Sequence, residues 1–211
     1  MRFPMDSQSD PLFFVTGFGP FGDHKHNPSW DVARAAGETL GTDPHLLPVT
    51  FEVAAQFTRA HLQAVSTTRL FFVHFGLAAD RSAVCFERRA RNRRSDDPST
   101  DDTSSADPSR LRPLVTDGRD QYPCLVDVST LTEKYNRRAS DALPDGRISK
   151  DCGAYVCNAL YYHSLRACVE ARTDGSAADA LFVHVPPLDD SEAARVGPLV
   201  ADIVTDLASS D

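Results

Sequence analysis

Apolar runs and helically spaced apolar positions alternate along this chain. Four or more largely apolar residues in a row predict strands at Leu12–Val15, His45–Phe51, Leu70–Phe75, Ala83–Glu87 and Leu181–Val185. Apolar positions repeating every three or four residues predict helices over residues 28–40, 53–64, 155–171 and 189–208. Strands that alternate with helices are typical of a three-layer α/β/α domain with a mostly parallel sheet. The nearly continuous apolar run Leu70–Phe75 is expected to be a central strand covered on both faces.

Two segments lack this alternation. Residues 93–110 are rich in Asp, Ser, Thr and Pro, and Ala106 is their only apolar side chain other than proline, which predicts a polar, mobile loop insertion. A tolerated surface insertion is the preferred interpretation, and a lid over the site is the alternative. Residues 1–10 are expected to form a flexible N-terminal segment without the layout of a secretion signal. We expect residues 1–211 to form one domain.

Composition narrows the class of protein. The chain has 211 residues and a net charge of −8, with no basic stripe, so a nucleic-acid partner is not expected. Its apolar stretches are shorter than a membrane span, so no membrane partner is expected and a cytoplasmic location is predicted. The five cysteines, an odd number in a chain without an export signal, are expected to be reduced thiols.

Four cysteine and histidine positions superficially resemble a zinc ligand set, namely Cys152, Cys157, His163 and Cys168. If residues 157–168 form one helix, Cys157 and Cys168 lie about 16 Å apart along its axis, and His163 points away from Cys157. These residues therefore cannot share one metal ion, and we expect no metal site.

The first strand is followed by a glycine-rich turn, Gly17 to Gly22, which formally matches a dinucleotide-binding pattern. Pro20 and two phenylalanines fill this turn, and the helical pattern begins only at Pro28, so the nucleotide interpretation is not favoured. Phe18 and Phe21 could instead wall an apolar pocket for a small ring. The alternative is that both rings simply pack beneath the loop.

Cys157 is the candidate nucleophile because a small-residue turn leads into a helix that begins near it. Backbone N–H groups and the positive end of the helix dipole favour a thiolate at such a position. His184 interrupts an apolar strand just before Pro186 and is a candidate base, with His74 as an alternative. Three further cysteines are expected to be buried small apolar residues rather than nucleophiles, namely Cys85, Cys124 and Cys168.

Four ordered segments resemble the pyroglutamyl-peptidase I family of cysteine peptidases. They are Thr16 to Phe21 with Asn27-Pro28-Ser29, His74 to Leu77 with Glu87 to Asn92, Asp151 to Asn158, and Phe182 to Pro186. The resemblance runs from about residue 12 to residue 188. It implies an open, twisted α/β/α sandwich and a hydrolase that removes an N-terminal pyroglutamyl residue through a thioester.

The resemblance assigns roles to individual residues. Cys157 becomes the nucleophile, His184 the general base, and Glu87 the carboxylate that orients the imidazole, with Asp80 as an alternative acid. Phe18 and Phe21 fall at positions that wall the substrate pocket. No metal or organic cofactor is implied, and relatives include both monomers and larger assemblies.

The chain also departs from the family pattern. Leu77, expected at the substrate pocket, stands where many bacterial members have glutamine, and the polar loop replaces a segment that follows their glutamate motif. These departures motivate an alternative function, in which a non-catalytic homologue binds pyroglutamyl or related peptide termini without cleaving them.

Overall fold

A computed structural model describes residues 11–64, 69–95, 110–139 and 141–209. The predicted flexible segment 1–10 and residues 96–109 of the predicted loop lie outside the described residues. The described strands include a six-stranded sheet in the order β2-β1-β3-β8-β4-β7. The strands are β1 (Leu12–Phe18), β2 (His45–Leu47), β3 (Leu70–Leu77), β4 (Val84–Glu87), β7 (Gly146–Ser149) and β8 (Ala178–Val185).

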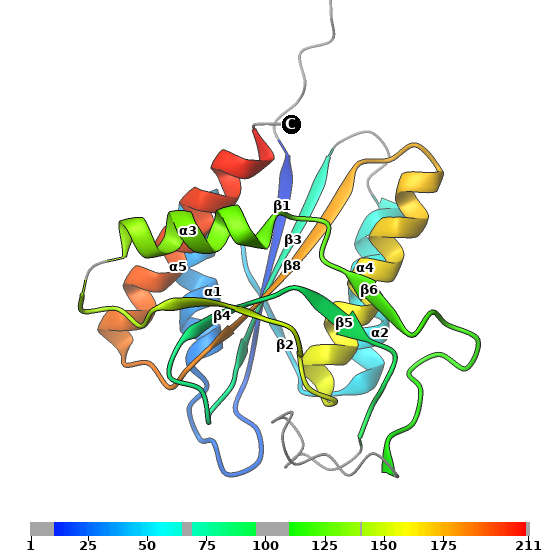
Figure 1. The fold of residues 1–211 in the computed structure, drawn as a ribbon, viewed down its shortest axis with the longest axis horizontal. Coiled ribbons are helices and arrows are strands. Elements are labelled where there is room, and N and C mark those ends of the chain that lie inside the picture. Colours follow the sequence, from blue (N-terminus) through cyan, green and yellow to red (C-terminus); the bar gives the residue numbers. More distant parts are fainter. Residues whose placement is uncertain (1–10, 65–68, 96–109, 140, 210–211) are drawn as a thin grey trace, which may run out of the picture.

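The sheet is open and mostly parallel. Only β4 runs against its neighbour β8, and the other adjacent pairs in this sheet are parallel. Helices α1 (Pro28–Leu40), α3 (Val128–Arg138) and α5 (Asp190–Ala208) cover one face, and α2 (Phe51–Ala64) and α4 (Val156–Thr173) cover the other (Figure 1). The predicted three-layer α/β/α architecture with a mostly parallel sheet is confirmed.

Two neighbouring strands form the centre of the sheet. Every residue of β3 and of β8 is buried, because both faces of these strands lie under helices. This confirms the prediction that Leu70–Phe75 belongs to a central strand. Their parallel register places Gly76 beside His184, so the candidate base lies near the carboxyl ends of both strands.

The structure corrects one predicted boundary. The second strand ends at Leu47 rather than at Phe51, and Phe51 is already the first residue of α2. Pro48 has no N–H to continue the ladder, and the Thr50 hydroxyl accepts a hydrogen bond from the Val53 amide at the start of the helix. The apolar side chains of Val49 and Phe51 thus pack against the core at the start of a helix.

Four elements were not predicted from the pattern. They are α3, β7 and the separate two-stranded ribbon of β5 (Arg89–Arg91) and β6 (Gln121–Pro123). The strands have three or four residues each, and α3 buries only Val128, Leu131 and Tyr135. Strands this short offer too few alternating positions to recognise, and α3 contains few apolar residues although these share one face.

The Asn27-Pro28-Ser29 motif fixes the loop that follows β1. Asn27 caps α1 by accepting hydrogen bonds from the Ser29 amide and hydroxyl, and it donates to the Gly19 carbonyl at 3.0 Å. Pro28 occupies the first helical turn, where a missing N–H costs nothing. The glycine-rich turn is therefore held against the start of α1.

Among the helices of the described residues, none is long and apolar enough to cross a membrane.

Candidate active site

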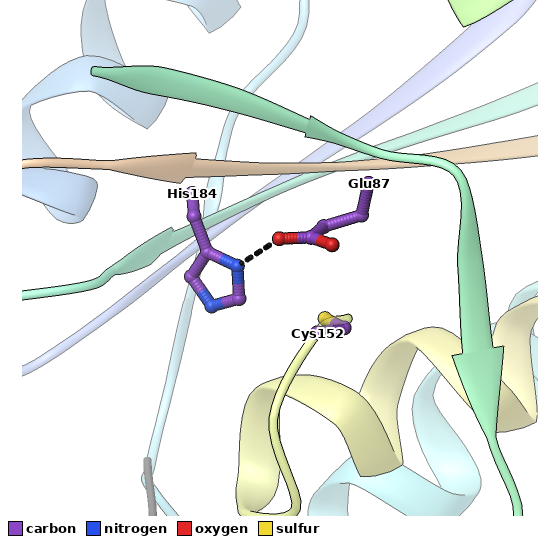
Figure 2. Close-up of side chains that lie close together, drawn as sticks. All are labelled: Glu87, Cys152 and His184. Carbon is purple, nitrogen blue, oxygen red and sulfur yellow. Dashed lines mark hydrogen bonds and ion pairs between the residues drawn. The ribbon is translucent and has the colours of Figure 1, made fainter. Parts of the chain in front are cut away.

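Glu87 and His184 form a buried hydrogen-bonded pair. Glu87 Oε1 accepts a hydrogen bond from His184 Nδ1 at 2.8 Å, and the side chains are 0% and 1% exposed (Figure 2). Antiparallel pairing places Cys85 of β4 beside His184 and Phe86 beside Val183. Glu87, one residue further along β4, therefore reaches His184 diagonally across the same face of the sheet.

The charge states of the pair follow from burial and from one neighbouring cation. Burial alone would raise the pKa of Glu87, but the hydrogen bond from His184 and the charge of the Arg81 guanidinium hold that pKa below its ordinary value. Burial lowers the pKa of His184, Glu87 opposes this, and Arg81 adds to the lowering. The pair is thus a carboxylate beside a neutral imidazole at neutral pH. With Nδ1–H directed at the carboxylate, Nε2 is the basic nitrogen.

Cys157 approaches the same face of the sheet from helix α4. It is the second residue of the helix, whose N-cap residue Tyr155 makes no capping hydrogen bond through its side chain. A Cβ atom built on Gly76 would lie 2.8 Å from Cys157 Sγ, so the absence of a side chain at this strand position admits the sulfur. Because Gly76 is the register partner of His184, the sulfur lies over the boundary between β3 and β8.

A small apolar cleft lies beside the sulfur. Its lining consists of Phe18, Phe21, Asn27, Val49, Leu77, Tyr155, Val156 and Cys157. The structure thus brings the three residues expected at the substrate pocket together with the expected nucleophile. Asn27, the most polar side chain of this lining, is already committed to capping α1.

Cys152 is a second thiol beside the acid–imidazole pair. One ligand-type atom from each of Glu87, Cys152 and His184 lies within 4.8 Å of the others, and all three residues are buried (Figure 2). Gly153, which follows Cys152, has φ of +83°, a conformation that favours glycine. Burial, reinforced by the charge of Glu87, raises the pKa of the Cys152 thiol well above its ordinary value. Cys152 is therefore a protonated thiol.

The same three residues are of types that bind transition metals, and they form the one such group among the described residues. However, the Arg81 guanidinium lies 2.7 Å from Glu87 Oε1 and already neutralises the carboxylate. A divalent cation there would face this fixed positive charge. Cys157, His163 and Cys168, three members of the zinc set considered from the sequence, do not belong to this group.

His74, the alternative base, belongs to a different network. Its two ring nitrogens bond the hydroxyls of Thr16 and Ser164, each at 2.9 Å, and Ser164 also bonds Thr58 at 2.6 Å. All four residues are buried, and burial lowers the pKa of His74 to about 3. His74 is thus a neutral core histidine with both nitrogens occupied.

The second candidate acid and the remaining thiols do not line the cleft. The carboxylate partner of His184 is Glu87, whereas Asp80 is exposed. Burial raises the thiol pKa of Cys85, Cys124 and Cys168, in Cys124 to about 11, and none of these thiols lines the cleft. They are poor nucleophiles at neutral pH.

Sequence reasoning missed three residues of this site, namely Gly76, Arg81 and Cys152. A glycine inside an apolar strand indicates a close approach of another group, so Gly76 could have been found. Arg81 and Cys152 carried no such signal, because their importance depends on contacts between distant segments.

Comparisons with known proteins agree on one family. A family model described as pyroglutamyl peptidase matches residues 12–203. Pyroglutamyl-peptidase 1 of Rattus norvegicus is 28% identical over 183 residues, covering 82% of this chain and 78% of the rat protein. Pyrrolidone-carboxylate peptidase of Pyrococcus furiosus is 29% identical over 188 residues, covering 87% and 84%.

Solved structures support the fold. The crystal structure of Bacillus amyloliquefaciens pyroglutamyl peptidase I superposes with a TM-score of 0.72 at 18% identity, covering 93% of this chain and 97% of that chain. Pyrrolidone carboxyl peptidase of Thermococcus litoralis gives a TM-score of 0.70 at 20% identity, covering 92% and 93%.

Proposed function

The chain belongs to the pyroglutamyl peptidase family, and from this premise we propose that it is a thiol-dependent omega-peptidase that removes the N-terminal pyroglutamyl residue from peptides. The observation that carries the proposal is the buried Glu87–His184 pair next to the strand position on which Cys157 Sγ packs. A nucleophile, a base and an acid that orients the base are the three parts that acyl transfer to sulfur requires.

Cys157 is the proposed nucleophile, in preference to Cys152. It lies in the first turn of α4, where backbone N–H groups and the helix dipole stabilise a thiolate, and it lines the cleft. Cys152 is absent from the cleft lining, and burial, together with the nearby negative charge of Glu87, raises its pKa and keeps it protonated. The two thiols therefore differ in their access to the cleft.

The reaction divides into two steps. In the first step the sulfur of Cys157 attacks the carbonyl carbon of the pyroglutamyl residue while His184 Nε2 takes the thiol proton. His184 then passes this proton to the leaving amine nitrogen, so that the C–N bond breaks and a thioester forms. Water then adds to the thioester, His184 accepts its proton, and the C–S bond breaks to release pyroglutamate and restore the thiol. Glu87 holds the ring in the tautomer that both steps need. Amides of the first turn of α4 would stabilise the oxyanion, a contribution of about 3 kcal/mol per donor.

The cleft suits a neutral ring. Pyroglutamate has its nitrogen in a lactam, so it carries no α-ammonium group that an acidic residue would have to neutralise. Phe18, Phe21 and Leu77 supply an apolar lining, and no charged side chain lies among the lining residues. We propose that these three side chains bind the ring.

The test is hydrolysis of L-pyroglutamyl arylamide under reducing conditions, with L-prolyl arylamide as the control substrate. Proline has a ring of the same size but a charged nitrogen, so only the pyroglutamyl compound should be cleaved. Cys157→Ala should remove the activity, whereas Cys168→Ala, in the same helix but buried in the core, should retain it. Absence of thiol-dependent cleavage above the level of Cys157→Ala would reject the proposal.

The alternative function, binding without cleavage, is not favoured because the acid–imidazole pair is intact. Calorimetry distinguishes the two. A binder would give a saturable heat with pyroglutamyl peptide and leave the peptide whole, whereas the peptidase would release pyroglutamate.

We also propose that the protein acts in the cytoplasm. All five cysteines are free thiols, as expected for a reducing compartment. The proposed partners are pyroglutamyl peptides, and the net charge of −8 makes nucleic acid a poor partner.

A further inference from the structure

Arg81 connects the acid of the site with the turn that precedes the proposed nucleophile. It lies between β3 and β4, and its side chain is only 15% exposed. Its Nη1 donates to Glu87 Oε1 at 2.7 Å, and its Nη2 donates to the backbone carbonyl of Asp151 at 2.9 Å. One rigid guanidinium therefore joins two segments that are 64 residues or more apart in the sequence.

The orientation of the Glu87 carboxylate depends on this contact. His184 Nδ1 and Arg81 Nη1 both donate to Oε1, while Oε2 is buried and has no hydrogen-bond partner among the described residues. A carboxylate held at a single oxygen by the imidazole alone could rotate about its side-chain bonds. The second donor on the same oxygen limits that rotation.

We propose that Arg81 is a positioning residue of the peptidase, which fixes Glu87 toward His184 and anchors the Asp151 carbonyl before the nucleophile helix. The inference rests on the proposed function for its kinetic consequences. Its geometric basis, however, is the pair of hydrogen bonds from Arg81, which exists independently of any substrate.

The same guanidinium sets the electrostatic environment of His184. Titratable and charged groups from several segments face this imidazole. They are Glu87 and Cys85 of β4, Arg81 of the turn before β4, Cys152 of the turn before α4, and Cys157 of the first turn of α4. Arg81 is the cation of this set, and it lowers the pKa of His184 by disfavouring the imidazolium. Loss of its charge should therefore raise the pKa of His184.

Arg93 provides a matched control. It also holds the turn before α4, through a hydrogen bond to the Gly153 carbonyl at 3.2 Å and a salt bridge with the Asp151 carboxylate. In the part of the chain that the structure describes, Arg93 bonds neither Glu87 nor His184. An effect that arises only from loosening this turn should therefore appear in Arg93→Met as well as in Arg81→Met.

The experiment compares Arg81→Met, Arg81→Lys and Arg93→Met by two readouts. The first is kcat and KM for pyroglutamyl arylamide, and the second is the NMR titration of the His184 ring, assigned by its disappearance in His184→Gln. We expect Arg81→Met to lose about 10²-fold in kcat with little change in KM, and its His184 to titrate at higher pH than in the wild type. Arg81→Lys keeps the charge and should restore the wild-type titration, with part of kcat.

Two results would overturn the inference. One is an unchanged kcat and an unchanged His184 titration in Arg81→Met, and the other is the reproduction of both effects by Arg93→Met. If Arg81→Met does not fold, Arg81→Lys carries the test, since it should lower kcat while His184 titrates as in the wild type. If no form of the protein cleaves the arylamide, the proposed function fails, but the titration still tests the role of Arg81.

Discussion

Two buried histidines lie on adjacent central strands but differ in their hydrogen-bond partners and in their position along the strand. His74 of β3 bonds two hydroxyls, one at each ring nitrogen, in the middle of the sheet. His184 of β8 bonds a carboxylate at Nδ1, near the carboxyl end of its strand and beside the proposed nucleophile. Burial lowers the pKa of both. The comparison teaches that the partner and the place along the strand, rather than burial, distinguish a structural histidine from a candidate base.

The largest expected difference between the two histidines is in catalysis. His184→Gln should lower kcat/KM for pyroglutamyl arylamide by about 10²- to 10⁴-fold, the usual contribution of a general acid–base. His74→Phe should keep kcat/KM within a few-fold when rates are corrected for the folded fraction. Steady-state kinetics on both variants measures this. Equal losses of kcat/KM in the two variants would contradict the distinction between a catalytic His184 and a structural His74.

Gly76 sharpens the comparison because it lies two residues after His74 on the same face of β3 and in register with His184. In Gly76→Ala the new methyl group would lie 2.8 Å from both Cys157 Sγ and the Phe182 ring, so the sulfur must move. We expect a loss of about 10²-fold in kcat. Slower alkylation of Cys157 by iodoacetamide, followed by mass spectrometry, would locate the cause at the sulfur. Wild-type kcat in this variant would contradict the described position of the sulfur.

The third expected effect is on stability. His74→Phe leaves the buried Thr16 hydroxyl without its ring partner, which should lower the free energy of unfolding at pH 7 by about 1–3 kcal/mol. Urea unfolding measures the change. His24→Phe, at an exposed position, should change the same quantity by less than about 0.5 kcal/mol. If His74→Phe were as stable as the wild type, the hydroxyl network would not stabilise the fold.

The fourth expected effect is a pH dependence of that stability difference. An unfolded histidine gains a proton below pH 6.5, whereas native His74 stays neutral down to about pH 3, so acidification in this window favours the unfolded state. The contribution of His74 is therefore complete above pH 6.5 and decreases as the pH falls. His74→Phe lacks this loss, so its stability deficit should shrink by about 1.4 kcal/mol per pH unit below 6.5. Urea unfolding at pH 7, 6 and 5 tests this, and a constant deficit would contradict it.

The sequence predicted the elements that carry long apolar patterns. β3, β8 and the helices α1, α4 and α5 follow from runs and spacings, because each buries many side chains. The arginine-rich ribbon strand β5 and the largely polar helix α3 did not follow, because they bury few. The second strand was predicted too long because the apolar residues Val49 and Phe51 pack against the core at the start of α2.

The candidate site was predictable only in part. His74 and His184 both interrupt apolar strands, and the sequence alone did not decide which of them has a carboxylate partner. That distinction depends on β4 running antiparallel to β8, a pairing between segments almost 100 residues apart. Cys152 and Arg81 reach the pair through turns whose course is set by tertiary contacts.

The position of β8 between β3 and β4 has a consequence for when the enzyme can first act. During synthesis the acid and both thiols are added to the chain before residue 184. Until β8 inserts between β3 and β4, the Cys157 thiol has no imidazole beside it to act as a base. The order of the sheet thus delays proteolysis until the strands around the site have all been made and assembled.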